Sequence, residues 1–390
     1  MKRRVFLVVL AASLVGLLFA LPSLAKIEQI CMYYDQTGRG DLSFNDMAAL
    51  GAEQAAAEFG LEMGEITAGS SADYLPDLLT LARSGECSVI IGVGFLLADA
   101  LPEAARQFPD AKFAFIDGES GGIENVLGVL FKEEQGAAPI GALAALAAIA
   151  DRYSTVAYLG GMEIPPVWRY EGGFRFGVHW ALDWYERTFG EKKLVTILGQ
   201  YVGRFDDPAG GKTAAQSQLA VAAHSIFGIA GLSHLGAFDA VEEEARALGR
   251  EIGPPYAFGA DASQEYVKPG FVLASARKRV DVGSYTAAKQ AYEGTFQGGT
   301  TLLLGIAEAG VGVSTLDDII DFIDIGIAAG QLTPDEKEAT LDKIQAARAQ
   351  IPTWVWDAVA ELEGLIARGE IEVPSASTAE QIAQVRQQYP

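Results

Sequence analysis

Short apolar runs alternate with helical patterns along this chain, and this alternation limits the possible folds more than any other feature of the sequence. "KIEQICMYY" (26–34), "CSVIIGVG" (87–94) and "KFAFID" (112–117) are typical of strands, whereas "FNDMAALGAEQAAAEFG" (44–60) is typical of a helix. Strands that are apolar on both faces and separated by helices indicate a parallel sheet covered on both sides. The first third of the chain therefore predicts a doubly wound α/β lobe.

A second series of the same kind follows, with strands such as "TVAYLGG" (155–161) and "YAFGAD" (256–261). The chain is longer than one hydrophobic core usually organises, so we expect two lobes. The strand-like "FVLASARKRVD" (271–281) is expected to return to the first lobe. Two lobes joined by crossing segments can close on a ligand by hinge motion. The predicted division is 26–120 with 262–298, 121–261 with 299–374 (including a helical insertion at about 314–350), and a tail at 375–390.

The first 25 residues have the layout of a secretory signal. Three basic residues precede an apolar run and the small-residue pattern "SLA", which predicts cleavage after Ala25 and export to the periplasm. The alternative is a retained membrane anchor, because the apolar run is near the lower length limit for spanning a bilayer. The cleavage point carries no cysteine, so lipidation is not expected. Cys31 and Cys87 either pair, if their strands are neighbours, or remain two buried thiols.

Charge and motif spacing exclude several kinds of chemistry. The net charge of −22 disfavours nucleic acid and anionic lipid as partners. "GGKT" (210–213) lacks the first glycine of a phosphate loop, since Asp206 stands there. The loop at 35–46 resembles a calcium loop, but Arg39 occupies a ligand position. The histidines show no ligand spacing, and no G-x-S-x-G motif occurs. We therefore predict no metal, no cofactor and no catalytic residue.

Two aromatic side chains suit a flat ligand. Phe44 opens a helix at the rim of the predicted crevice, where we expect Ser43 to cap the helix and Asp46 to complete an S-x-x-D box. Phe205 lies in "GRFDDP", the equivalent loop of the second lobe. One ring from each lobe would sandwich a planar group, and each face would contribute roughly 1–3 kcal/mol.

Three carboxylates follow predicted strands, namely Asp35, Asp117 and Asp261. Ligands of open α/β sheets bind at the carboxyl ends of the strands. There, carboxylates can accept hydrogen bonds from ribose hydroxyls or ring N–H groups. Taken singly, each of the three acids is more typical of a turn or a helix cap than of a ligand site.

Several blocks of the sequence resemble the basic membrane protein (BMP) family of substrate-binding proteins. "GDLSFND" (40–46) resembles the D-x-S-F-N signature of the family, and "AYLGGMEIPPVWRYEGGFRFG" (157–177) is the most specific match. "QYVGRFDDPAGGKTAA" (200–215) and "AFGADASQ" (257–264) follow in family order. The resemblance covers about 27–374. It implies a type I periplasmic-binding-protein fold, with two doubly wound parallel-sheet lobes joined by a hinge. It also implies a monomeric, non-enzymatic receptor that serves an ABC importer and its permease in the inner membrane, commonly for nucleosides.

The resemblance also implies a role for each of eight residues. Phe44 and Phe205 would stack on the ligand, Asn45 and Asp117 would read a base edge, Asp35 and Asp261 would hold ribose hydroxyls, Lys278 would lie nearby, and Gly231 would allow close backbone approach.

The chain also departs from the family pattern. Ser263 replaces the second acid of D-x-D-Q, and "LSHLG" (232–236) replaces a glycine-rich turn. These departures leave the ligand open between a purine nucleoside and another flat molecule such as riboflavin. Trp168 and Tyr170 are expected to pack beneath their loop rather than to shape the pocket. Two rival functions use the same cleft: a nucleoside hydrolase, which would need clustered carboxylates around calcium, and the ligand-sensing module of a membrane receptor kinase.

Overall fold

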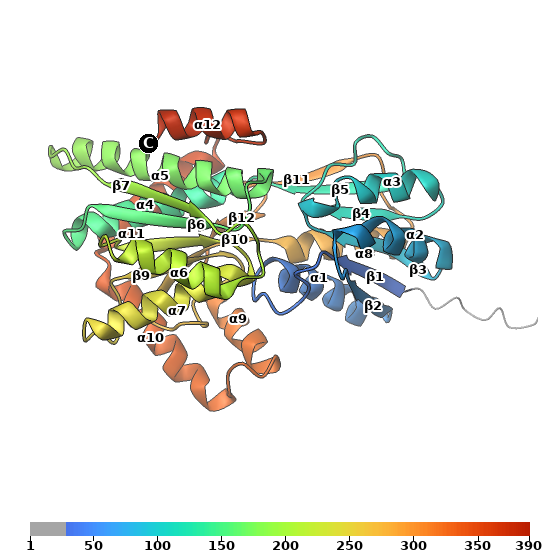
Figure 1. Cartoon of the computed structure of the whole chain (residues 1–390), viewed down its shortest axis with the longest axis horizontal. Helices are drawn as coiled ribbons and strands as arrows, with labels where there is room; N and C mark the ends of the chain where they lie inside the picture. The colour runs from blue at the N-terminus through green and yellow to red at the C-terminus, as the bar shows by residue number, and fades with distance from the viewer. Residues whose placement is uncertain (1–28) are drawn as a thin grey trace, which may run out of the picture.

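The computed structural model describes residues 29–390, which form two α/β lobes, each built on a six-stranded sheet (Figure 1). The first sheet has the order β11-β5-β4-β3-β1-β2, and the second has the order β12-β10-β9-β8-β6-β7. The first contains β1 (Gln29–Tyr34), β2 (Glu62–Thr67), β3 (Cys87–Val93), β4 (Phe113–Ile116), β5 (Val126–Phe131) and β11 (Thr301–Leu304). The second contains β6 (Thr155–Gly160), β7 (Thr196–Tyr201), β8 (Ser225–Ile229), β9 (Tyr256–Asp261), β10 (Val272–Lys278) and β12 (Val311–Val313). The paired strands are parallel except β12, which runs antiparallel to β10.

Helices cover both faces of each sheet. The first lobe carries α1 (Phe44–Phe59), η1 (Ser71–Asp73), α2 (Tyr74–Ser84), η2 (Phe95–Leu97), α3 (Ala100–Gln107) and α8 (Val280–Glu293). The remaining helices are α4 (Glu133–Ala150), α5 (Pro165–Phe189), α6 (Pro208–Leu219), α7 (Leu232–Ala247), α9 (Leu316–Ala328), η3 (Pro334–Glu336), α10 (Lys337–Gln350), α11 (Thr353–Ala367) and α12 (Ala379–Gln388). In the first lobe, α1 packs with α8 and α2 with α3; in the second, α4 packs with α5 and α6 with α7. This arrangement confirms the predicted pair of doubly wound lobes.

The chain crosses between the lobes three times, between β5 and α4, between β10 and α8, and between β11 and β12. The strand pairings contradict the predicted lobe limits at three strands. β5 and β11 pair with each other in the first sheet, although their ranges were assigned to the second lobe. β10 pairs with β9 in the second sheet, and only the following helix α8 returns to the first lobe. A strand that is apolar on both faces has no sequence pattern that identifies its pairing partner, so the sequence did not assign these strands to the correct sheet.

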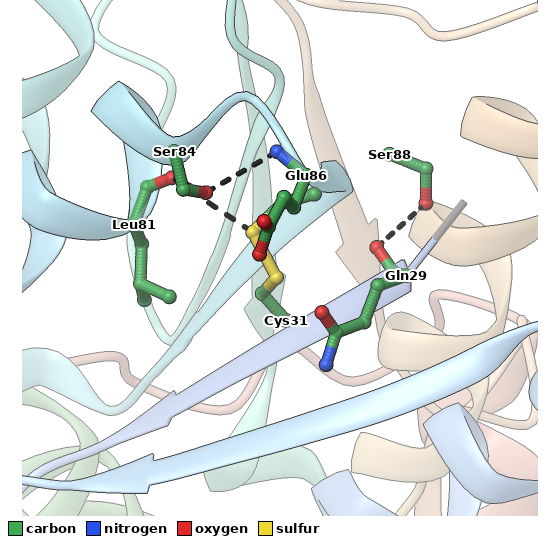
Figure 2. Close-up of a disulfide and its surroundings, with 7 residues drawn as sticks. Gln29, Cys31, Leu81, Ser84, Glu86 and Ser88 are labelled. Atoms are coloured by element: carbon green, nitrogen blue, oxygen red, sulfur yellow. Dashed lines mark hydrogen bonds between the residues drawn. A yellow bond between two sulfur atoms is a disulfide. The ribbon is translucent and has the colours of Figure 1, made fainter. Parts of the chain in front are cut away.

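Cys31 and Cys87 form a disulfide that joins β1 to β3 (Figure 2). The two strands are hydrogen-bonded neighbours, and the two Cα atoms lie 5.6 Å apart. Of the two alternatives left open by the sequence, the structure therefore shows the paired one. Disulfides persist in oxidising compartments outside the cytosol, which agrees with the predicted export.

The predicted leader and its cleavage site lie outside the described residues. Between residues 29 and 390, no helix has the length and apolar character that crossing a bilayer requires. The predicted insertion at about 314–350 corresponds to α9, η3 and α10, which project from the second lobe (Figure 1).

Candidate ligand-binding site

A pocket with about 590 Å³ of atom-free space, counted to its open mouth, lies between the lobes at the carboxyl ends of the strands. It brings together all eight residues that the sequence singled out: Asp35, Phe44, Asn45, Asp117, Phe205, Gly231, Asp261 and Lys278. The other lining residues are Thr37, Asp41, Gly94, Phe95, Leu96, Ile164, Pro166, Val167, Tyr170 and Ile229. The position agrees with the rule that open α/β sheets bind ligands in the crevice beyond their strand ends.

The two predicted stacking rings come from opposite lobes. Phe44 is the first residue of α1, and Phe205 lies in the loop between β7 and α6. Both are partly buried and line the pocket. Phe205 packs closely on Gly161, where an added Cβ would stand 2.3 Å from the ring. Gly161 therefore fixes how deeply the Phe205 ring can sit.

The start of α1 is capped differently from the sequence prediction. The carboxylate of Asp41 accepts hydrogen bonds from the backbone N–H groups of Ser43 (3.0 Å), Asn45 (2.9 Å) and Asp46 (3.2 Å). Ser43 makes no side-chain cap, so the predicted capping box is wrong. Its hydroxyl instead donates across the lobe boundary to the carbonyl oxygen of Ala260 (2.9 Å) and to Oδ2 of Asp261 (3.0 Å). Burial raises the pKa of Asp41 to about 7.

Lys278 is the one cation among the described lining residues, and its side chain is buried. Its Nζ lies 2.7 and 2.8 Å from the two carboxylate oxygens of Asp117 and 2.9 Å from Oε1 of Glu133. The same Nζ lies 4.7 Å from the centre of the Phe44 ring. Asp117 directly follows the first-lobe strand β4 and Lys278 ends the second-lobe strand β10, so this ion pair joins the two lobes.

Burial and the neighbouring charges set the ionisation of this group. Burial raises the pKa of Asp117 to about 6, although Lys278 opposes the rise. Burial also acts to raise the pKa of Glu133, but Arg169 and Lys278 together hold it below its usual range. Arg169 contacts Glu133 at 2.5 Å, and neither residue lines the pocket. The result is a buried network of two cations and two carboxylates.

Asp261 is held by hydrogen bonds from both lobes. Its Oδ1 accepts from the hydroxyl of Tyr170 (2.9 Å), and its Oδ2 accepts from Ser43. Tyr170 is buried and forms part of the pocket wall, so the expectation that it only packs beneath its loop is wrong. Trp168, by contrast, packs against the C-terminal cluster that contains Ile382. Burial raises the pKa of Asp261.

Asp35 and Asn45 each retain an oxygen that can accept a hydrogen bond. Oδ1 of Asp35 accepts from the backbone N–H of Thr37 (2.8 Å), and burial raises the pKa of this acid. Nδ2 of Asn45 donates to the carbonyl oxygen of Gly38 (2.8 Å), which fixes the orientation of the amide. Oδ1 of Asn45 is buried and has no hydrogen-bond partner among the residues that the structure describes. An unpaired buried acceptor beside a pocket is suited to a ligand N–H or O–H donor.

The sequence did not identify Asp41, Glu133, Arg169 or Tyr170 as part of this site. Asp41 directly precedes "LSFND", and Asp is a preferred residue at helix starts, so its position could have predicted that it caps α1. Glu133 lies in α4 and Arg169 lies in α5, and the sequence of each helix is typical of a packing element. The two residues meet only because α4 packs against α5.

Comparisons with known proteins agree with this architecture. The family model "Bmp: ABC transporter substrate-binding protein PnrA-like" matches residues 27–326. The chain is 40% identical over 366 residues to a protein of Pyrococcus abyssi named as a lipoprotein, covering 93% of this chain and 87% of that one. It is 27% identical over 325 residues to the ABC transporter nucleoside-binding protein BmpA of Lactococcus lactis subsp. cremoris, covering 78% and 88%.

A solved structure shows the same fold. The crystal structure of an ABC transporter system solute-binding protein from Aeropyrum pernix K1 matches with a TM-score of 0.85 and 35% sequence identity. The match covers 93% of this chain and 97% of that one. ABC substrate-binding proteins are exported, bind small molecules and work with a membrane permease. From its sequence, its fold and its inter-lobe pocket, this chain belongs to the Bmp family of PnrA-like ABC transporter substrate-binding proteins.

Proposed function

We propose that this protein binds a purine nucleoside, or a flat aromatic ligand of similar shape, between its lobes and delivers it to a membrane permease. The observation that carries the proposal is that Phe44 and Phe205 line one pocket from opposite lobes. Two rings that approach from opposite sides suit a planar guest, because stacking on each face contributes roughly 1–3 kcal/mol. The name of the Lactococcus relative, a nucleoside-binding protein, supports the same ligand class.

The polar lining suits the remaining parts of a nucleoside. Asp35 follows β1 of the first lobe and Asp261 ends β9 of the second lobe, and both offer carboxylate oxygens to ribose hydroxyls. Asn45 offers its unpaired Oδ1 to a donor on the base edge. Asp117 is already paired with Lys278, so the pair acts together, with Lys278 available to a ring acceptor and Asp117 to a ring donor. A site that pairs with specific donors and acceptors rejects analogues that lack them.

We further propose that the bound ligand leaves unchanged, rather than being hydrolysed. A nucleoside hydrolase of the kind considered above would use adjacent carboxylates to hold a divalent cation. Here the adjacent acids Asp117 and Glu133 hold the ammonium group of Lys278 at 2.7–2.9 Å, and this positive charge takes the place that the cation would need. Incubation with inosine followed by a reducing-sugar assay tests this point, and release of ribose at a catalytic rate contradicts it.

The protein is proposed to act as a monomer in the periplasm, after cleavage behind Ala25. Lipid attachment at Cys31 is incompatible with the structure described here, because the sulfur of Cys31 is bonded to Cys87. Mass spectrometry of the exported chain tests both statements. A mature N-terminus at residue 26 without added lipid is the expected result, and a lipid-modified Cys31 contradicts it.

The ligand is identified by a thermal-shift screen of nucleosides, free bases and flavins, followed by calorimetry on the stabilising compounds. We expect Phe44→Ala and Asp261→Ala each to weaken nucleoside binding at least about tenfold, which corresponds to loss of one stacking face or one charged hydrogen bond. Phe189→Ala is the matched control, because Phe189 lies at the far end of α5 and does not line the pocket. Folded variants with unchanged affinity contradict the assignment. If riboflavin is the only compound that stabilises the protein in this screen, the ligand is a flavin rather than a nucleoside.

A further inference from the structure

The last residue of β9 lines the pocket and has a backbone conformation that needs support. Asp261 ends β9 with φ of +67°, in the left-handed region that residues with a side chain adopt at a cost of about 1–2 kcal/mol. Gln264 closes the turn, because its Oε1 accepts from the backbone N–H of Ala260 (3.0 Å). Its Nε2 donates to the carbonyl oxygen of Leu42 in the first lobe (2.9 Å). The position of Asp261 therefore depends on what holds residues 262–266.

Glu265 holds residues 262–266 in place through an ion pair and hydrogen bonds. Its side chain is fully buried, and its Oε1 accepts a hydrogen bond from Nη2 of Arg348 (3.0 Å). Its Oε2 accepts from the hydroxyl of Ser275 (3.2 Å), which in turn accepts from the backbone N–H of Gln264 (3.0 Å). The same Nη2 of Arg348 donates to the carbonyl oxygen of Ser314 (3.1 Å). A close counter-charge and hydrogen bonds offset the cost of burying a carboxylate, and Arg348 supplies that charge to Glu265.

Arg348 belongs to the hairpin formed by α9, η3 and α10, which also packs against the next residue of the segment. Tyr266 is buried in one cluster with Ile319 and Ile323 of α9 and Ile344 of α10. A Cβ at Gly326 of α9 would stand 2.9 Å from the Tyr266 ring, so the contact is tight. The hairpin therefore holds Glu265 by charge and Tyr266 by packing.

We propose that Arg348 is a positioning residue for ligand binding: through Glu265 it fixes the 261–266 segment and thereby places the Asp261 carboxylate in the pocket. The hairpin at 314–350 then acts as a support for the ligand site rather than as a separate appendage. This inference rests on the proposed function in one respect, namely that Asp261 holds the hydroxyl groups of the ligand. Arg348 itself does not line the pocket.

The test compares a nucleoside with its free base on matched variants. Arg348→Met removes the charge and the hydrogen bonds, and Lys343→Met makes the same change at an exposed site on the same helix. Because a displaced Asp261 affects the sugar but not the stacked ring, we expect Arg348→Met to weaken inosine binding at least about tenfold, with hypoxanthine affinity unchanged within about twofold. Lys343→Met should match the wild type for both compounds. An equal loss for nucleoside and base indicates a general effect on closure or folding and overturns the proposal.

Two further measurements keep the proposal falsifiable. Arg348→Met leaves Glu265 unpaired and is expected to reduce stability, so the double variant Arg348→Met/Glu265→Gln, which removes both charges, is measured as well. It should show the same selective loss of inosine binding. Amide hydrogen exchange of the unliganded proteins should be at least about tenfold faster at residues 261–266 in both variants than in Lys343→Met. If the wild type binds neither inosine nor hypoxanthine, the proposed function fails, and the exchange rates alone decide the positioning role. Unchanged exchange at 261–266 overturns it.

Discussion

Replacement of Lys278 by methionine tests the charge network at the centre of the site. Lys278 is buried, and its Nζ lies within 2.9 Å of both Asp117 and Glu133. Methionine keeps much of the side-chain volume but removes the positive charge. Glu133 retains its contact with Arg169, so the carboxylate left without a cation is that of Asp117. Breaking a buried ion pair by removal of one partner costs about 3–5 kcal/mol of unfolding free energy.

The loss should depend on pH in a definite direction. The pKa of Asp117 is raised from 3.8 to about 6 while Lys278 is present, and removal of Lys278 raises it further. A carboxyl group whose pKa is raised in the folded state stabilises the fold when protonated, and this stability is lost as the pH rises through the folded pKa. At about pH 5, Asp117 of the variant is therefore neutral and the loss is small. At about pH 8 it is ionised without a partner, and the full 3–5 kcal/mol applies.

Urea unfolding at these two pH values measures the effect. Lys192→Met, at an exposed position, is the control for loss of a lysine charge. The double variant Lys278→Met/Asp117→Asn should recover most of the stability at about pH 8, because it carries no unpaired buried charge. A loss below about 1 kcal/mol at pH 8, or an equal loss at both pH values, refutes the account of this network.

Two other substitutions should also change the free energy of unfolding: one neutralises a buried carboxylate, and the other removes the disulfide. Oε2 of Glu134 is buried without a hydrogen-bond partner in the described part of the chain, and burial raises the pKa of this acid from 4.5 to about 7. Glu134→Gln should therefore be more stable than the wild type at pH 8, by at most about 3 kcal/mol, with the advantage disappearing below about pH 4.5. Urea unfolding across that range measures the difference, and a constant difference contradicts the reasoning. Cys31→Ser/Cys87→Ser opens a link between residues 56 apart and should lower the unfolding free energy by about 2–4 kcal/mol. An unchanged urea midpoint would show that the link does not constrain the unfolded chain.

The alternation of strands and helices was sufficient to predict two doubly wound lobes, but not which strand joins which sheet. β5, β10 and β11 were all assigned to the other lobe. Their pairing depends on contacts between distant parts of the chain, such as that of β11 with β5. Local sequence patterns do not predict such contacts. Helix α8 does lie in the lobe predicted for it, but the chain crosses between β10 and α8 rather than before β10 as predicted.

The pocket was easier to predict than the contacts within it. Asp35, Asp117 and Asp261 each follow a strand, and the carboxyl ends of parallel strands meet along one edge of a sheet. The hydrogen-bond or ion-pair partner of each side chain could not be predicted from the sequence. Ser43 faces Asp261 across 218 positions, and Arg348 reaches Glu265 across 83. Such pairs depend on how the lobes and the α9–α10 hairpin dock, and local sequence rules describe neither.

Titration of the mature wild-type protein and of the double variant Phe44→Ala/Phe205→Ala with purine nucleosides tests the central claim most directly. We expect saturable binding of one nucleoside per wild-type chain. We also expect a loss of at least about thirtyfold in the double variant, since two stacking faces at roughly 1–3 kcal/mol each are removed. Equal affinity in the two proteins, with the variant shown to be folded, would contradict the claim that the two rings grip the ligand.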